Sequence, residues 1–169
     1  MNRRRQKKLS GQLFAAIWRG DTARARALLR AGADPEGADG EGTTPLYVAS
    51  VHGEAAIVRL LLVSGAAPDT ESRGIGAEGT PLCAAACWGH TEAVRELLAH
   101  GADPDLREDH GTGLSPLDWA NHGPHPETAA LLTSAGATPR PRTTRQSRPA
   151  RTQPCGPRYP SDASIRPAR

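Results

Sequence analysis

The strongest constraint on the fold is a short string that recurs along the chain. Leu-Leu-x-x-Gly-Ala occurs with its glycine at Gly32, Gly65 and Gly101, and a looser copy, Leu-Thr-x-x-Gly-Ala, has its glycine at Gly136. Consecutive glycines of this series lie 33, 36 and 35 residues apart. Repetition at such a period is typical of a solenoid, in which short units stack because none can bury its apolar side chains alone.

Each unit has the pattern of two short helices. A Thr or Ser followed by Pro-Leu occurs at residues 44–46, 80–82 and 115–117. The hydroxyl can cap the first turn of a helix, and proline fits its first position. Gly53 and Gly89 can end these helices in the left-handed conformation. Apolar residues spaced three and four apart then predict a second helix in each unit, which ends at the glycine of the first string.

The composition limits the core to small side chains. Only 4% of the residues are aromatic, whereas 37% are hydrophobic in the wide sense. A large aromatic core is therefore excluded, and closely packed helices rich in Ala, Leu and Val remain possible. No apolar run approaches the ~18 residues of a membrane span. Cys83, Cys87 and Cys155 are too few for a disulfide framework, so we expect a cytoplasmic protein with no membrane association.

These strings resemble the ankyrin repeat, whose period is near 33 residues. The most similar copy is TPLCAAACWGH at 80–90, followed by LLAHGAD at 97–103. The resemblance covers residues 10–137 and implies an all-α solenoid of helix-turn-helix units joined by hairpin-like turns. The expected units are 10–37, 38–70, 71–106 and 107–137. A basic N-terminal arm, 1–9, and an Arg- and Pro-rich tail, 138–169, flank them, and we expect these basic tails to be disordered.

The chain departs from the family pattern at several positions. The side chain that usually hydrogen-bonds to the turn is the histidine after Thr-Pro-Leu. In the four units its place is taken by Phe14, Tyr47, Cys83 and Asp118. The first unit lacks Thr-Pro, and Pro124 stands where the family has glycine, as is typical of units that cap a repeat array.

The resemblance also implies where a partner would bind. Ankyrin repeats generally bind other proteins through the turn tips and the variable positions of the first helix. We therefore predict a protein-binding surface from these positions and from the long turn at 71–79, because inserted turns often lie on the binding side. Its candidate residues are Trp18, Arg19, Val51, His52, Arg73, Glu78, Cys87, Trp88, Trp119 and His122. All three tryptophans belong to this set, and tryptophan is enriched at interface hot spots.

The tryptophans have a second interpretation, in which they fill gaps between helices or shield the ends of the stack. Trp18 and Trp119 belong to the end units and fit this structural role better than Trp88 does. Replacing Trp88 by Ala separates the two interpretations. Loss of a partner with an intact fold indicates a binding residue, and loss of stability indicates a core residue.

Catalytic and metal-binding motifs are absent from the sequence. Cys83, Cys87 and His90 have the spacing C-x3-C-x2-H, which is not a recognised pattern for structural zinc. The sequence contains no nucleophile elbow, HExxH motif or phosphate-binding loop. The glycines at 74–79 lead into a Thr-Pro helix start, so they indicate a turn. We predict no metal, no cofactor and no enzymatic activity.

The net charge of +3 hides a strong segregation. Residues 1–8 carry +5, residues 9–137 carry −9, and residues 138–169 carry +7. A basic tail could lie on nucleic acid in a salt-dependent way, could fold back over the acidic repeats, or could act as a solubilising extension. Abundant Ala, Gly, Pro and Arg with only two Lys favour a GC-rich bacterial source.

These observations predict a non-catalytic scaffold that binds a protein with a basic patch through an acidic concave surface. We expect it to be a monomer. Two other functions stay open: a nucleic-acid-associated protein that binds through its tails 1–8 and 138–169, and an accessory or immunity-type protein that masks a partner enzyme. Gel shifts of the full chain and of a 9–137 fragment at two salt concentrations distinguish the nucleic-acid alternative.

Overall fold

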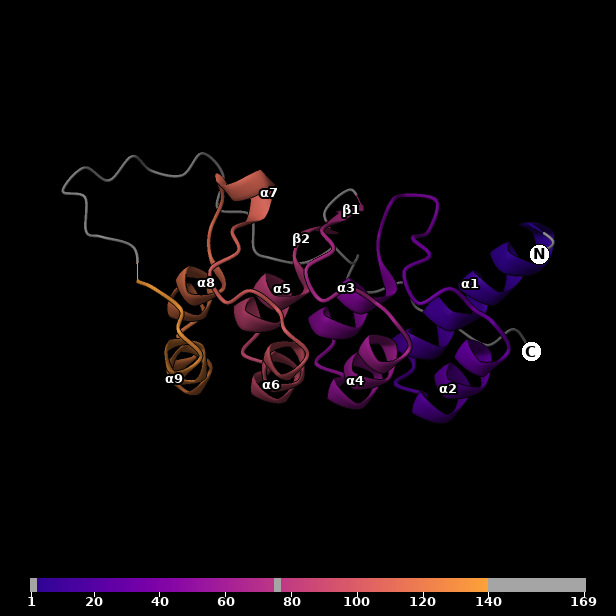
Figure 1. Ribbon diagram of the computed structural model, residues 1–169, viewed down its shortest axis with the longest axis horizontal. Helices are drawn as coiled ribbons and strands as arrows, with labels where there is room; N and C mark the ends of the chain where they lie inside the picture. The colour runs from indigo at the N-terminus through magenta and orange to yellow at the C-terminus, as the bar shows by residue number, and fades with distance from the viewer. Residues whose placement is uncertain (1–2, 75–76, 140–169) are drawn as a thin grey trace, which may run out of the picture.

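The computed structural model describes residues 3–74 and 77–139, which form an elongated stack of four helix pairs (Figure 1). The pairs are α1 (Arg3–Trp18) with α2 (Thr22–Arg30), α3 (Pro45–Val51) with α4 (Ala55–Val63), α5 (Pro81–Cys87) with α6 (Thr91–Ala99), and α8 (Pro116–His122) with α9 (Pro126–Ser134). Two smaller elements lie in the inserted turns: an antiparallel hairpin of β1 (Ser72–Gly74) and β2 (Ala77–Gly79), and the short helix α7 (Glu108–Gly111). The expected all-α repeat fold is confirmed.

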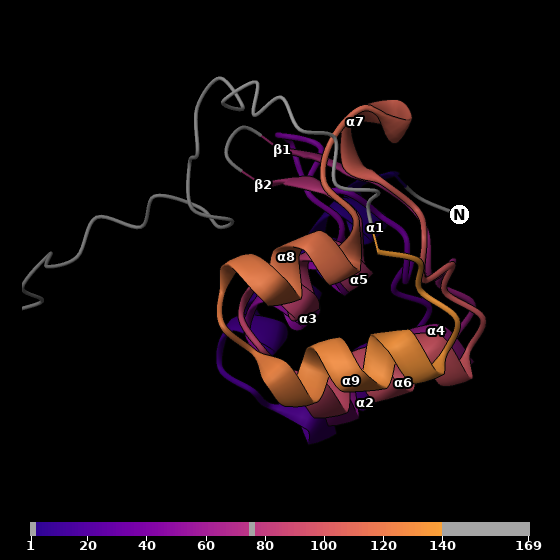
Figure 2. The same cartoon turned by 90° about the vertical axis from the view of Figure 1, so that its left-hand side faces the viewer.

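The helices form two layers, which an end-on view separates (Figure 2). We call α1, α3, α5 and α8 the inner helices, and α2, α4, α6 and α9 the outer helices. Along the stack α5 packs between α3 and α8, and α6 packs between α4 and α9. The hairpin and α7 project from the inner layer, so the cross-section of the stack is L-shaped (Figure 2).

Local signals define the inner helices as the sequence predicts. The hydroxyls of Thr44 and Thr80 accept hydrogen bonds from backbone N–H groups in the first turns of α3 and α5. Ser115 and Asp118 form a reciprocal capping box at the start of α8. After α3 and α5 the chain turns at glycines with φ of 68° and 69°, which favour a residue without a side chain.

The core is continuous through the stack and is built from small and branched apolar side chains. Each helix pair contributes fully buried residues, among them Ile17, Leu61, Leu97 and Leu132, all 0% exposed. Burial of one such side chain contributes about 1.5–3 kcal/mol. Ala49, Ala85, Ala93 and other buried alanines let the helices approach closely. The scarcity of aromatic residues therefore suits this architecture.

Carboxylates join each turn to the next unit. Each accepts a hydrogen bond from a backbone N–H more than 30 residues further along the chain. The bonds run from Ala67 to Glu36, from Asp103 to Asp69, and from Thr138 to Asp105, at 2.8, 3.1 and 2.7 Å. Charge-assisted bonds of this kind are stronger than neutral ones, so part of the acidic charge of the repeats serves stacking.

The N-terminal arm differs from the expectation. Helix α1 begins at Arg3, so the prediction of a disordered basic arm is wrong for residues 3–9. Leu9 packs against the core, and the Ser10 hydroxyl donates to the Gly37 carbonyl at 3.3 Å. These contacts continue the helix beyond the first repeat unit. The tail predicted from residue 138 lies outside the described residues from 140 onward. Within the described ranges no helix has the length and apolar character to span a membrane.

Candidate partner-binding surface

The inner helices present equivalent positions at their C-terminal ends, because the units repeat. One row consists of Trp18, Val51, Cys87 and His122. The adjacent row consists of Arg19, His52, Trp88 and Gly123. The inner helices lie side by side (Figure 1), so the two rows run along the stack. We call the residues of these two rows the inner surface. It brings together seven of the ten predicted site residues.

Two tryptophans of the inner surface are half exposed. Trp18 is 50% exposed and Trp88 is 47% exposed. Among the described residues only one other large apolar side chain, Val63 on the outer helix α4, is counted as exposed, at 72%. The Trp18 and His52 rings lie 5.8 Å apart between centroids, with planes inclined at 51°. Exposed apolar area of this kind is available for burial by a partner.

The half-buried residues of the inner surface are held by the following unit. The Nε2–H of His90 donates to the Val51 carbonyl, and that of His125 donates to the Cys87 carbonyl, each at 3.0 Å. Burial lowers the pKa of His90, which keeps its ring neutral. These bonds fix the ends of α3 and α5. The sequence showed Gly-His at 89–90, but it gave no sign of the bond that each histidine makes.

Trp119 occupies a different environment from the other two tryptophans. It is partly buried, packs against the main core, and donates its indole N–H to Glu108 Oε2 at 2.8 Å. Its ring also lies 6.3 Å from that of the exposed His122. Trp119 therefore joins α8 to the segment that carries α7, in keeping with the structural interpretation of this tryptophan.

The Glu108 carboxyl, which accepts the hydrogen bond from Trp119, is a buried acid. The residue is 8% exposed, and its Oε1 atom is buried with no hydrogen-bond partner in the described part of the chain. Burial, with smaller contributions from the charges of Asp109 and Glu71, raises the pKa of Glu108 to about 7. The hydrogen bond from Trp119 opposes this increase. Glu108 therefore titrates near neutral pH.

The residues that replace the family histidine make bonds of their own. The Cys83 thiol donates to the carbonyls of Leu106 and Leu114, at 3.8 and 3.7 Å. The Asp118 carboxylate accepts from Arg107 at 3.2 Å, in an ion pair that is only partly exposed. The turns before the fourth unit are therefore tied to α5 and α8 even though no histidine is present.

The two remaining predicted residues lie in the hairpin. Arg73 pairs with Glu78 in the register of the strands, and its backbone N–H donates to the Gly42 carbonyl at 3.1 Å. The Arg73 side chain is exposed. The Glu78 side chain lies outside the part of the molecule that the structure describes. The hairpin is thus anchored on the preceding loop and does not contribute to the rows of the inner surface.

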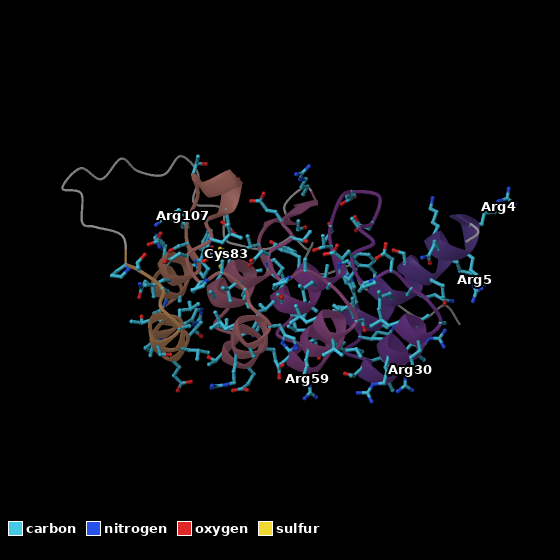
Figure 3. The ribbon with its side chains drawn as sticks, viewed as in Figure 1. Arg4, Arg5, Arg30, Arg59, Cys83 and Arg107 are labelled. Carbon is cyan, nitrogen blue, oxygen red and sulfur yellow. The ribbon has the colours of Figure 1, made fainter. Side chains whose placement is uncertain are left out.

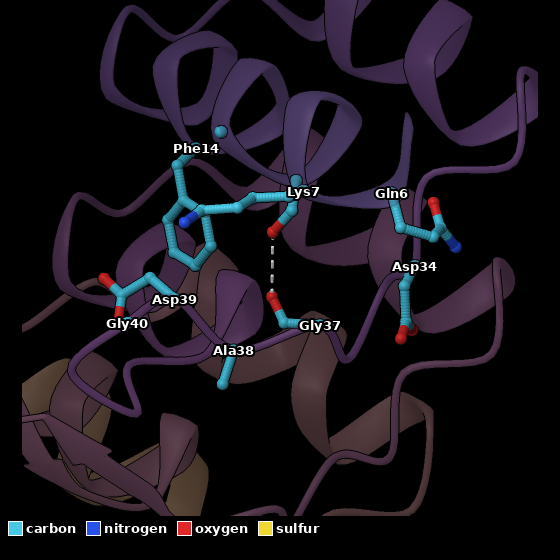
Figure 4. A pocket seen from close by; sticks show the side chains of 10 residues that line it. Gln6, Lys7, Phe14, Asp34, Gly37, Ala38, Asp39 and Gly40 are labelled. Atoms are coloured by element: carbon cyan, nitrogen blue, oxygen red, sulfur yellow. Dashed lines mark hydrogen bonds between the residues drawn. The ribbon is translucent and has the colours of Figure 1, made fainter. Parts of the chain in front are cut away.

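A pocket lies at the N-terminal end of the stack. It is an open pocket of about 740 Å³ between α1 and the loop at 34–40 (Figure 4). Gln6 and Lys7 line one side, and Asp34 and Asp39 line the other. Both carboxylates already accept backbone N–H bonds within their own loop. Their role in the loop leaves the pocket without a defined ligand chemistry.

Two features of the described residues bear on metal binding and on thiol reactivity. No group of three or more His, Cys, Asp or Glu side chains in this part of the chain could hold a metal ion. Burial raises the pKa of the Cys83 thiol well above its ordinary value, so it is a poor nucleophile.

Comparison with known families decides the class of repeat. A model of three consecutive ankyrin repeats matches residues 68–143, and a model of a single ankyrin repeat matches residues 41–73. The chain is an ankyrin repeat protein. The two matches span the inner and outer helices from α3 to α9, whereas α1 and α2 lie outside them. A search of curated proteins found no match. Ankyrin repeats are generally protein–protein interaction modules, and they are generally non-catalytic.

Proposed function

We propose that this ankyrin repeat protein is a non-catalytic scaffold that binds a partner protein across the inner surface. The observation that carries the proposal is the exposure of Trp18 and Trp88 at the C-terminal ends of α1 and α5. Tryptophan provides a large, rigid contact area with few rotatable bonds. The chain has three tryptophans, and two of them are exposed enough for a partner to bury them.

The rigidity of the stack supports this function. The bonds from His90 and His125 hold the ends of α3 and α5, and the backbone of each unit is joined to the next by carboxylates. Binding to such a preformed surface loses little conformational entropy. The side chains that would contact a partner therefore need no large rearrangement.

The charge of the repeats indicates the chemistry of the partner. Residues 31–139 contain sixteen acidic and four arginine residues, a net charge of −12. The inner surface itself contains no Asp or Glu, so this charge would act at long range, by speeding the approach of a partner with a basic patch. Within this proposal the scaffold acts as a monomer in the cytoplasm.

The test is capture of a partner by the tagged chain from cells of its own source, followed by affinity measurement with that purified partner. Trp88→Ala is expected to weaken binding by about thirtyfold, the effect of a hot spot worth ~2 kcal/mol. Val63→Ala is the matched control, because Val63 is exposed on the outer layer. It is expected to leave affinity unchanged.

The proposal is contradicted if Trp88→Ala binds the partner as tightly as the wild-type chain does. It is equally contradicted if Val63→Ala and Trp88→Ala weaken binding to the same extent, since the contact would then not depend on the inner surface. Circular dichroism of both variants controls for loss of fold.

A further inference from the structure

Folding brings the basic residues of α1 and α2 together in the first helix pair. Helices α1 and α2 span residues 3–30, which contain nine basic residues and one acid, Asp21. The first helix pair therefore carries +8, whereas residues 31–139 carry −12. Arg24, Arg26 and Arg30 of α2 lie within residues 9–137, the segment whose net charge is −9. In the folded chain they belong to one basic end.

The basic side chains of this end are exposed and mostly unpaired. The exposed ones are Arg4, Arg5, Lys7, Lys8, Arg19, Arg24, Arg26 and Arg30. The ion pairs of the described part of the chain involve Arg95 and Arg107, and none of them involves Arg5, Lys7, Lys8, Arg19, Arg24, Arg26 or Arg30. Arg4 and Arg5 lie at the far end of α1, and Arg30 lies on the outer helix α2 (Figure 3). The charge is thus available to a ligand.

The position of the charge is unfavourable for the free protein. The first turn of α1 contains three consecutive arginines and no acid. The N-terminus of a helix carries partial positive charge, and a like charge there costs about 0.3–1 kcal/mol. A bound anion would relieve this repulsion and would interact favourably with the helix dipole.

The basic residues of α1 lie in its first two turns, at positions 3–8, and residues 9–18 carry no charge. At 1.5 Å per residue these positions span about 8 Å of the helix axis. Helix α2, which packs against α1, adds Arg24, Arg26 and Arg30. A linear polyanion can therefore contact several basic side chains at once.

We propose that the exposed basic residues of α1 and α2 bind the phosphate backbone of nucleic acid, independently of sequence. We call the exposed basic residues of these two helices the basic end: Arg4, Arg5, Lys7, Lys8, Arg24, Arg26 and Arg30. Arginine dominates it, and the guanidinium group matches phosphate with two parallel hydrogen bonds. The acidic remainder of the stack repels nucleic acid and so directs it to this end.

A membrane surface and an acidic protein fit the basic end less well. A membrane-binding helix presents apolar side chains to the lipid, but the apolar residues Leu13 and Ile17 of α1 are buried in the core. A protein interface contains apolar anchors at its centre, and Trp18 is the only large apolar side chain exposed on α1 and α2.

The test is fluorescence anisotropy of the full chain with a labelled duplex of about 20 base pairs, at about 50 and 200 mM salt. The triple variant Lys8→Gln/Arg26→Gln/Arg30→Gln removes three charges from the basic end. The control Arg59→Gln/Arg73→Gln/Arg95→Gln removes three exposed charges from the rest of the stack. Both keep residues 140–169 and have the same net charge. Glutamine is a good helix former, so neither substitution set should disturb α1, α2, α4 or α6.

We expect the basic-end triple to bind about tenfold more weakly or worse at the lower salt, with a salt slope smaller by about 2–3. The control triple should bind within about twofold of wild type. Trp88→Ala should bind the duplex normally, which separates this proposal from partner binding at the inner surface.

Four results would overturn the proposal. Equal loss in the two triples would mean that only net charge matters, and no loss in either would assign binding to other residues. If the basic-end triple lost more affinity for phosphatidylserine vesicles than for the duplex, the site would be a membrane site. If polyglutamate displaced the labelled duplex as effectively as unlabelled duplex does, at equal charge, the ligand would be an acidic protein.

Discussion

The first and last helix pairs occupy equivalent places in the stack but have opposite chemistry. In the first pair Ala15 holds the inner-helix position that Trp119 holds in the last pair. Trp18 stands one turn later and is half exposed, whereas Trp119 is partly buried and bonded to Glu108. The last pair follows an inserted segment, and this segment supplies Glu108 as the acceptor for the Trp119 indole N–H.

The turns between the two helices also differ at the ends of the stack. Gly20 has a φ of 64° in the first pair, and Pro124 has a φ of 26° at the same position in the last pair. The proline ring favours φ near −65°. The last pair therefore has a less favourable turn and a more firmly held tryptophan. The comparison shows that capping units of one fold can gain and lose stability at different positions.

The largest expected effect is the loss of the Trp119 contacts. Trp119→Ala should destabilise the chain by about 3 kcal/mol, because it removes core packing and leaves the buried Glu108 carboxyl without its donor. Trp18→Ala should cost less than about 1 kcal/mol, because half of the side chain is already in water. Urea denaturation measures both. Equal costs would break the contrast between the two ends.

The next largest effect is the pH dependence of stability that Glu108 causes at the last helix pair. The folded-state pKa of Glu108 is raised from 4.5 to about 7, so folding favours the protonated form. The associated stability is complete below about pH 4.5 and is lost as the pH rises through about 7. Wild type should therefore lose on the order of 1–3 kcal/mol relative to Glu108→Gln between pH 5 and pH 8. Parallel stability curves for the two proteins would contradict this account.

The turns provide a smaller test with opposite signs. Pro124→Gly should stabilise the chain by about 1–2 kcal/mol, because glycine adopts positive φ without strain. Gly20→Ala should destabilise it by about the same amount, since alanine is strained at the φ of 64° that Gly20 adopts. Thermal unfolding of the two variants measures the difference. A destabilising Pro124→Gly would show that the proline is not strained.

The smallest expected effect belongs to the start of α1. Arg4→Gln/Arg5→Gln should raise stability by about 0.5–1 kcal/mol at low salt, because it removes like charges from the positive end of the helix dipole. The gain should disappear at about 1 M salt, where the charges are screened. Arg59→Gln in the middle of α4 serves as the control and should change nothing. A loss of stability in the double variant would mean that these arginines support the fold.

The repeat architecture was accessible from the sequence because its signals are local. Caps such as Thr44 and Thr80, and the glycines that follow α3 and α5, act within one turn of the chain. The start of α1 was not accessible, because basic residues before a repeat resemble a disordered arm. Its continuation depends on contacts of Leu9 and Ser10 with the core and with the loop at residue 37.

The candidate surface was predictable to a lesser extent. The family resemblance located the positions of its rows, and the structure places Trp18 and Trp88 at the surface. The bond between Trp119 and Glu108 could not be anticipated, since an inserted turn has no family pattern to follow. The basic end could not be predicted from charge along the sequence, because Arg26 and Arg30 lie in a segment of net negative charge. Folding brings these two arginines beside α1.

The most direct test of a preformed inner surface is the free energy of unfolding of Trp88→Ala, measured beside Trp119→Ala. A binding residue contributes little to the isolated fold, so Trp88→Ala should lie within about 1 kcal/mol of wild type. Trp119→Ala should fall well below it. A loss for Trp88→Ala as large as that for Trp119→Ala would contradict the account, because both tryptophans would then be structural.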